Sequence, residues 1–384
     1  MPKKKKPVKN FEEILDQNEE FKITVDLINK DKGETVLRSL NEEKPTFEGA
    51  LSSGSLGLDW AINKTAGGMK WGQLLQLYGE KSGGKSTIAL GFAANCTHLG
   101  KQVVYMDLEG SMDVGMVKNA GVDPELFYFL EEDGREAALI AERVMRAGNV
   151  GLLVIDSLAW WEPEVVAKKG SSSTDMVDFT SPKMAYQGSF ITQVVKKLCR
   201  TARETGTVII SVNQVRNSLD MFSGLNIVPY GPKALDHAIS VQCLVRGKPR
   251  GEKNIITDVD GELIGQYARI LVDKNKTAIP MQQTCIPLIL GVGVNPYMEL
   301  ATLAQEWGIV TGTAGNFKWV DSGEKICRGI AKFVQLLADD KELYSNLREK
   351  VIEMMGLEYH TDPVNAYDNK LCNKSSEFTL VKNE

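Results

Sequence analysis

Cysteine and histidine are scarce in this chain of 384 residues, and neither residue type is spaced as a metal site requires. The six cysteines are spread widely without a C-x-x-C pair, which argues against a zinc ribbon and against a disulfide framework. None of the three histidines is spaced with a cysteine or with another histidine as zinc ligands are. We therefore expect neither a structural metal centre nor a disulfide-stapled fold.

Long apolar runs and an excess of positive charge are also lacking. No run approaches the roughly 20 residues needed to span a bilayer, and the basic N-terminus has no apolar signal core. We expect a cytoplasmic protein with no membrane partner. The formal net charge of -5 excludes a chain that is basic throughout, so any contact with nucleic acid must come from local patches.

The pattern of apolar residues divides the chain into segments. A basic run at residues 3–6 favours a solvated arm, and apolar residues recur at helical spacing from residue 11 to about residue 40. Residues 1–45 are therefore predicted to form a basic arm and a small helical module. A break at residues 45–49 separates this module from the rest of the chain.

From residue 50 onward, short apolar strands alternate with amphipathic helices. This alternation predicts crossover connections and a mostly parallel sheet covered on both faces. Strands are expected at 74–78, 103–106, 152–155 and 208–212, with helices at 86–99 and 137–147. Further strands, antiparallel at one edge, are expected at 241–245, 268–272 and 285–290. Helices with a strand at 317–320 predict a small α+β domain over 291–357, followed by a polar tail at 358–384.

The most specific motif comes directly after the first of these strands and fits G-x-x-x-x-G-K-[ST]. Glycines let backbone N–H groups surround phosphates, and the helix that follows directs its positive end to the same charge. The lysine can reach the β- and γ-phosphates of ATP, and the serine hydroxyl can bind Mg²⁺. The alternative is a glycine-rich turn without a ligand. The residues of the motif are Gly79, Glu80, Lys81, Ser82, Gly83, Gly84, Lys85 and Ser86.

Two acidic residues follow other apolar strands. Asp156 ends the run Leu152–Ile155, where a carboxylate at the carboxyl edge of the sheet would lie near the metal. Glu109 follows the strand at 103–106 and is a candidate general base that orients the attacking water. A helix cap or a surface acid is the other interpretation of Glu109.

Taken together, residues 46–356 resemble the RecA family of homologous-recombination recombinases, in a divergent bacterial or phage-encoded form. Residues 53–59 are similar to the family's lead-in to the ATPase core, 105–109 to its strand with the catalytic glutamate, and 154–157 to its Walker B strand. Residues 211–216 are similar to the strand end whose glutamine, here Gln214, senses the γ-phosphate. Residues 273–276 are similar to the segment whose two lysines, here Lys274 and Lys276, reach ATP on the neighbouring protomer.

The resemblance implies a RecA-type P-loop core over 46–290 and further nucleotide contacts by Thr87, Asp113 and Met116. It also implies two DNA-binding loops, at about 163–184 and 215–232. Loops of this length are uncommon in a compact domain unless they are functional, although plain exposed loops are the alternative. The candidate DNA contacts are Lys168, Lys169, Ser171, Ser172, Met184, Arg216, Ser218, Met221, Phe222, Tyr230 and Lys233.

The chain departs from the family pattern at several positions. The first loop is several residues longer, Ser218 stands at a basic position, and Lys233 replaces an asparagine. His237 replaces an aromatic residue of the protomer interface, and Met116 stands where a tyrosine stacks on adenine. The C-terminal tail is not strongly acidic, which removes the basis for self-regulation by that tail.

The resemblance implies a DNA-dependent ATPase that forms helical filaments on single-stranded DNA and exchanges strands with a homologous duplex. Such an enzyme needs ATP and Mg²⁺, and its partners are single-stranded DNA, double-stranded DNA and further copies of itself. The alternatives are a hexameric helicase of the same core, a recombination mediator, and an ATP-driven signalling protein. A mediator would tend to lose Glu109 or the lysine pair, and this chain keeps both.

Overall fold

The structure, a computed structural model, describes residues 11–33, 36–37, 47–162, 183–217, 227–247, 255–257, 262–312 and 315–364. The chain divides into two compact units, Met1–Glu48 and Gly49–Glu384, and each is described by itself. In the first unit, helix α1 (Phe11–Lys32) confirms the helix predicted there. Its side chains Phe21, Ile23 and Leu27 are largely exposed.

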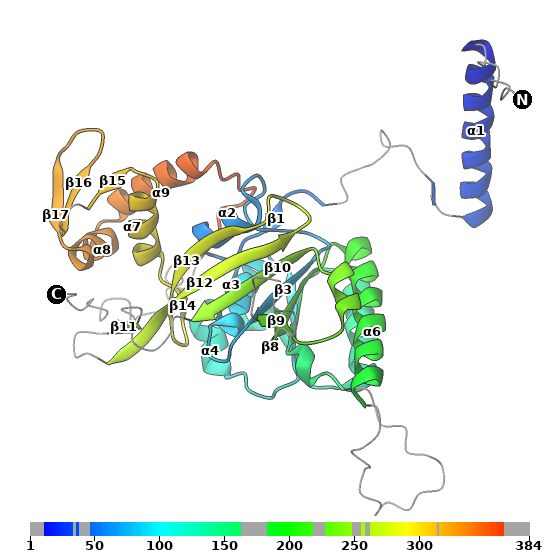
Figure 1. Cartoon of the computed structure of the whole chain (residues 1–384), viewed down its shortest axis with the longest axis horizontal. Coiled ribbons are helices and arrows are strands. Elements are labelled where there is room, and N and C mark those ends of the chain that lie inside the picture. The colour runs from blue at the N-terminus through cyan, green and yellow to red at the C-terminus, as the bar shows by residue number, and fades with distance from the viewer. Residues whose placement is uncertain are drawn as a thin grey trace, which may run out of the picture. The chain divides into compact units, whose positions relative to one another are not determined.

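The second unit is built around a sheet in which ten strands are described. Figure 1 labels β3, β10, β11, β12, β13 and β14 of this sheet. Six neighbouring strands run parallel: β10 (Val241–Gly247), β3 (Leu74–Gly79), β7 (Val208–Asn213), β6 (Val150–Asp156), β4 (Gln102–Asp107) and β5 (Phe127–Leu130). Antiparallel strands extend the sheet beyond β10: β12 (Leu263–Asn275), with β11 (Ile255–Thr257) at one end, then β13 (Gln282–Ile289) and β14 (Gly293–Val294). The predicted α/β class with a mostly parallel central sheet is confirmed.

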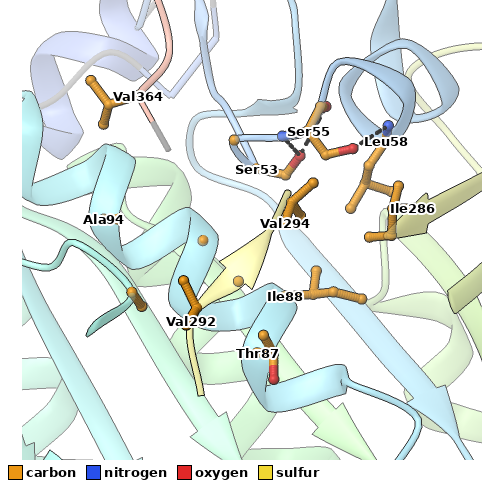
Figure 2. A pocket seen from close by; sticks show the side chains of 14 residues that line it. Ser53, Ser55, Leu58, Thr87, Ile88, Ala94, Ile286, Val292, Val294 and Val364 are labelled. Carbon is orange, nitrogen blue, oxygen red and sulfur yellow. Dashed lines mark hydrogen bonds between the residues drawn. The ribbon is translucent and has the colours of Figure 1, made fainter. Parts of the chain in front are cut away.

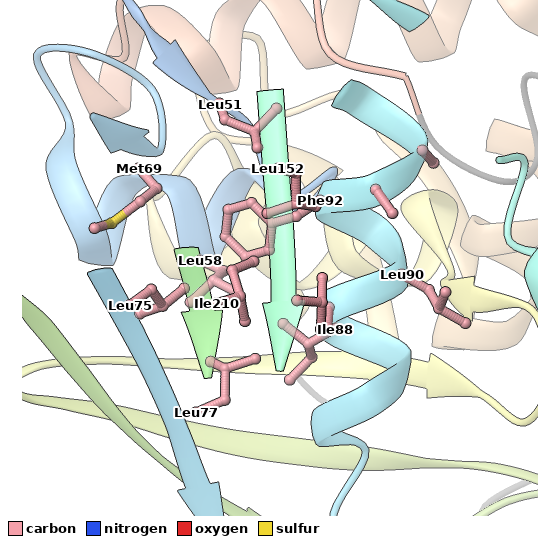
Figure 3. Close-up of a cluster of buried hydrophobic side chains, with 14 of the residues drawn as sticks. Leu51, Leu58, Met69, Leu75, Leu77, Ile88, Leu90, Phe92, Leu152 and Ile210 are labelled. Atoms are coloured by element: carbon pink, nitrogen blue, oxygen red, sulfur yellow. The ribbon is translucent and has the colours of Figure 1, made fainter. Parts of the chain in front are cut away.

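Successive side chains of the strands enter two separate cores, because a strand projects alternate residues to opposite faces. In β4, Val103 and Tyr105 belong to one buried cluster, while Val104 and Met106 belong to the other. The first cluster, part of which is drawn in Figure 3, packs under α3 (Lys85–His98) and α4 (Val114–Asn119). The second packs under α5 (Gly134–Ala147) and α6 (Lys183–Thr205).

Short elements connect this framework. They are β1 (Ala50–Leu51), α2 (Leu56–Asn63), β2 (Met69–Lys70), η2 (Pro124–Leu126), η3 (Leu158–Trp160), β8 (Val215–Asn217), β9 (Ile227–Pro229) and η4 (Lys233–His237). Strand β5 was not predicted, and it forms the parallel edge of the sheet. No helix in the described ranges is long and apolar enough to cross a membrane.

A third core cluster lies in the C-terminal part and confirms the predicted α+β character. Its elements are α7 (Pro296–Glu306), β15 (Val310–Thr311), β16 (Asn316–Trp319), β17 (Lys325–Arg328), α8 (Ile330–Asp339) and α9 (Lys341–Met355). Phe333, Leu337 and Val351 are fully buried there. Helix α9 begins at the cap Asp340, whose side chain accepts from two backbone N–H groups, and ends at Gly356 with φ of 65°.

Residues 358–364, the described start of the predicted polar tail, are not loose as their polar composition led us to expect, because they bind back to the core. Glu358 N donates to Lys64 O (3.1 Å), and the Tyr359 hydroxyl donates to Asp59 Oδ2 (3.0 Å). Val364 and the Asn95 side chain of α3 exchange two hydrogen bonds, of 2.8 and 2.9 Å. These bonds tie the end of the C-terminal part to the helix that follows the phosphate loop.

Two fully buried carboxyl groups hold the segment between β1 and α2. Glu299 of α7 accepts from the Ser55 hydroxyl and from Gly57 N (3.1 Å), while Asp59 accepts from Ser52 and from Ser53 N (2.7 Å). Burial raises the pKa of Glu299 to about 7 and that of Asp59 to about 6. The C-terminal part is therefore joined to the core through carboxyl groups whose pKa values burial raises above their usual range.

Glu299→Gln is expected to flatten the pH dependence of stability. The folded protein keeps a proton on Glu299 at pH values where the unfolded chain, with a pKa near 4.5, has released it. The stability that this proton contributes is therefore lost as the pH rises through that window to about 7. Between pH 5 and 8, urea unfolding should show wild type losing roughly 2–3 kcal/mol more than the variant. Parallel losses in both proteins would contradict this account of Glu299.

Candidate functional site

The phosphate loop follows β3, and its backbone conformation suits the binding of an anion. Ser82 and Gly84 have positive φ values of 59° and 91°, and such a loop gathers backbone N–H groups into a concave nest. The Gln266 side chain of β12 donates to Ser82 O (2.6 Å) and fixes the loop against the sheet. At Gly79, a Cβ atom would come within 2.0 Å of Val245 O, so only glycine fits there.

Lys85 lies folded over this loop as the first residue of α3. Its ammonium group donates to Gly79 O (3.1 Å) and to Glu80 O (2.6 Å), and the side chain is buried. Burial lowers the pKa of Lys85, and the charges of Asp156 and Glu109 act in the opposite direction. The ammonium group is thus held at the carbonyl groups of the loop, where it can also donate hydrogen bonds to a bound anion.

The side chains of Ser86, in the first turn of α3, and Asp156, at the end of β6, contact each other. The Ser86 hydroxyl donates to Asp156 Oδ2 (2.7 Å), and the buried Tyr105 hydroxyl donates to the same oxygen (2.6 Å). Burial raises the pKa of Asp156, and these two hydrogen bonds lower it. Burial, and next the charge of Asp156, raise the pKa of Tyr105 well above its usual range, so its hydroxyl remains a donor.

Glu109 lies in the turn after β4, exposed and close enough to Lys85 to influence its charge. Asp107, the last residue of β4, accepts from Ser111 N (3.2 Å) and Met112 N (2.9 Å) and so shapes this turn. Asp107 also pairs in register with Asp156 of β6. The carboxyl ends of β3, β4 and β6 therefore bring Lys85, Asp156 and Glu109 to one edge of the sheet, as predicted.

These residues fit ATP and Mg²⁺ in their chemistry. The loop offers N–H groups and an ammonium group to phosphates, while Ser86 and Asp156 offer the oxygen ligands that Mg²⁺ prefers. The Ser157 hydroxyl, directly after Asp156, is buried without a hydrogen-bond partner within the described ranges. A buried polar atom of this kind is costly unless it gains a partner.

Two predicted nucleotide contacts, Asp113 and Met116, lie at the start of α4 and on it. Asp113 caps this helix by accepting from Gly115 N, and Met116 is half-buried against the first core. A Cβ atom on Gly291, in the turn after β13, would lie 4.0 Å from Met116 Cγ. The turn after β13 therefore lies against α4, and the sequence did not reveal this because the two segments are far apart in the chain.

Thr87 of α3 lines a narrow, mainly apolar cavity (Figure 2). Its walls include Ile88, Ile286 and Val294, and Val364 stands at its rim. Its volume is only about 20 Å³, enough for a single water. This cavity is too small and too apolar to hold phosphates.

Gln214 follows β7 at the same edge of the sheet and leads into a short hairpin that was predicted as a loop. Strands β8 and β9 pair with each other, so 215–217 and 227–229 are extended rather than irregular. Tyr230 N donates to Gln214 O (2.8 Å), and the Asn213 side chain donates to Tyr230 O (2.6 Å). The two ends of the second predicted DNA loop are thereby joined at Gln214.

A hollow of about 590 Å³ lies beside this hairpin. It brings together three predicted DNA contacts, Arg216, Tyr230 and Lys233. The opposite wall comes from α6 and was not predicted: Gln187, Gly188, Ser189, Ile191, Thr192 and Gln193. The feature of the sequence that could have revealed these residues is the group of polar side chains near the start of α6, directly after the first predicted DNA loop. This polar wall can donate hydrogen bonds to a phosphate backbone.

Several predicted DNA contacts cannot be placed. Lys168, Lys169, Ser171, Ser172, Ser218, Met221 and Phe222 lie outside the described residues. Met184 belongs to α6, which begins at Lys183, so the end of the first predicted loop is helical. The side chain of Met184 also lies outside the described residues.

Lys274 and Lys276 lie apart from the phosphate loop of their own chain. Lys274 pairs in register with Gln242, which pairs with Gln76 near the start of β3, whereas the loop follows the end of β3. The two ammonium groups donate to the carbonyls of Asp236 and His237 in η4.

Comparison with known proteins agrees with the arrangement at this edge of the sheet. A family model described as "RecA N-terminal domain" matches residues 19–295. Protein RecA of Lactococcus lactis is 31% identical over 334 residues, covering 86% of this chain and 82% of the relative. Protein RecA of Streptococcus mutans is 29% identical, covering 92% and 90%. Protein RecA of Chlorobium chlorochromatii is 30% identical, covering 88% and 91%.

Proposed function

Because the chain belongs to the RecA family, we propose that it is an ATP-dependent recombinase that polymerises on single-stranded DNA and exchanges strands with a homologous duplex. The observation that carries this proposal is the position of Gln214. Its strand ends beside the phosphate loop, and its carbonyl oxygen closes the hairpin that lines the polar hollow. One short segment thus connects a nucleotide site with a candidate DNA site.

In this proposal ATP binds with its phosphates against the loop. Lys85 turns from the loop carbonyls towards the β- and γ-phosphates, and the N–H groups of Gly83 and Gly84 bind their oxygens. Ser86 and Asp156 hold Mg²⁺, which neutralises negative charge on the phosphates when bound. Glu109 accepts a proton from the water that attacks the γ-phosphorus. Asp113 and Met116 contact the base.

A second protomer completes the site. Lys274 and Lys276 of the adjacent molecule stabilise the negative charge that develops on the transferred phosphoryl group. ATP binding then favours contact between protomers, and hydrolysis through Glu109 weakens it. The exposed apolar side chains of α1 suit a role of residues 1–45 in this assembly, since a lone helix cannot bury its own apolar face.

We assign DNA binding to the hollow beside α6 and to the two loops predicted at about 163–184 and 215–232. Arg216 and Lys233 supply positive charge, while Tyr230 supplies an aromatic surface for bases. In this division of the chain, residues 46–290 form the ATPase core and 291–357 a separate α+β domain. Such a protein would act in the cytoplasm of a bacterium or of a phage-infected host.

ATP hydrolysis with and without single-stranded DNA tests this function, with the same samples imaged by electron microscopy. We expect DNA to stimulate hydrolysis strongly and to produce extended helical filaments, because the two sites are coupled and coupling is reciprocal. Hydrolysis that DNA does not change, or closed rings in place of filaments, would favour a motor or a signalling protein.

A further inference from the structure

Tyr105 lies on β4, next to the edge strand β5, and its side chain reaches the nucleotide site at Asp156. It lies opposite Val154 of β6, and its side chain is completely buried. The ring packs beside Phe127 and Phe129 of β5, with ring centroids 5.7 and 6.3 Å away. Packing alone would be satisfied by a phenylalanine at this position.

The hydroxyl group distinguishes Tyr105 from its aromatic neighbours. A buried hydroxyl is costly unless it finds a hydrogen-bond partner, and this one donates to Asp156 Oδ2 at 2.6 Å. The same carboxylate oxygen accepts from Ser86 Oγ at 2.7 Å. Three oxygens from three different elements, β4, β6 and α3, thus converge on one point.

We propose that Tyr105 is a positioning residue of the metal site, whose hydroxyl holds the Asp156 carboxylate in the orientation in which it serves Mg²⁺ together with Ser86. This inference rests on the proposed function, because it deepens the assignment of Ser86 and Asp156 as metal-holding groups. Groups that hold the ligands of a metal in place commonly set its affinity. Tyr105 is suited to this task because its ring is fixed by β5 and its hydroxyl cannot turn to solvent.

The same bond also sets how freely Asp156 can move. Asp156 is only 4% exposed, so it has little access to water that could replace a lost donor. Without Tyr105, the carboxylate would keep only Ser86 as a side-chain donor in the described part of the protein. A serine hydroxyl can bind the ion through a lone pair of its oxygen while its hydrogen still points to Asp156. Tyr105 is the second donor that fixes the orientation of Asp156, and its hydroxyl does not itself bind the ion.

The test is Tyr105→Phe, which keeps the ring and removes the hydroxyl. Binding of a fluorescent, non-hydrolysable ATP analogue is measured in EDTA and across a Mg²⁺ titration. Direct Mn²⁺ binding in the presence of the analogue is followed by electron paramagnetic resonance. We expect the Mg²⁺ midpoint and the Mn²⁺ dissociation constant to rise on the order of 10- to 100-fold. Affinity for the analogue in EDTA should stay within about twofold, because no phosphate-binding group is changed.

Tyr359→Phe is the matched control. It removes another bond from a tyrosine hydroxyl to a buried carboxyl group, that of Asp59, far along the chain from the phosphate loop. We expect it to lower thermal stability without moving the Mg²⁺ midpoint. An unchanged midpoint in Tyr105→Phe would overturn the proposal, as would an equal shift in both variants. If wild type itself bound the analogue without any dependence on Mg²⁺, the proposed nucleotide site would fail instead.

Discussion

Glu109→Gln is expected to reduce ATP hydrolysis by roughly 10²–10⁴-fold, the usual contribution of a general base. Glutamine keeps the size and polarity of the side chain but cannot accept the proton of the attacking water. Glu109 is exposed, and the turn that presents it is shaped by Asp107, so the substitution should leave the fold intact. Single-turnover hydrolysis with single-stranded DNA present is the measurement.

Nucleotide binding should survive this substitution, because Lys85 and the phosphate loop are unchanged. Glu131→Gln provides the control, since Glu131 is also exposed and follows the neighbouring strand β5 at the same edge of the sheet. We expect the control to hydrolyse ATP at the wild-type rate. A Glu109→Gln protein that keeps more than about a third of the wild-type rate would exclude Glu109 as the base.

Gln214→Ala is expected to abolish the stimulation of hydrolysis by DNA while ATP binding stays close to that of wild type. The hairpin should persist, because the bond from Tyr230 N reaches the backbone oxygen of residue 214 and not its side chain. The amide that responds to the γ-phosphate would be gone, so the nucleotide could no longer bias the DNA site. Hydrolysis rates over a range of DNA concentrations, together with analogue affinity, measure this effect.

Reciprocity makes the test sharper, because coupling between two sites must act in both directions. In Gln214→Ala, ATP should no longer tighten the binding of single-stranded DNA. Lys233→Ala serves for comparison, since loss of one cation from the hollow should raise the DNA concentration required without lowering the maximal stimulation. Stimulation of Gln214→Ala at the wild-type level would refute the coupling.

The sequence predicted those features that depend on short continuous segments. The phosphate loop is read from eight consecutive residues, and Asp156 from the apolar run that precedes it. Parallel pairing then brings Asp156 and Gln214 to the edge where the loop lies, because all three follow parallel strands. The nucleotide half of the site could therefore be assembled without coordinates.

Features that depend on contacts between distant segments were missed. Tyr105 looked like one more apolar residue of a buried strand, because only the fold shows that its hydroxyl reaches Asp156. Residues 358–364 were expected to be loose because they carry no apolar periodicity, yet they are held by backbone groups and by polar partners such as Asn95 and Asp59. The α6 wall of the hollow was missed for the same reason.

Joint-molecule formation between single-stranded DNA and a labelled homologous duplex tests the central claim most directly. With ATP and Mg²⁺, we predict that the protein pairs the two DNAs and exchanges strands, and that a duplex of unrelated sequence gives no product. Failure to pair homologous DNA although filaments form, or separation of duplex strands regardless of homology, would contradict the recombinase account.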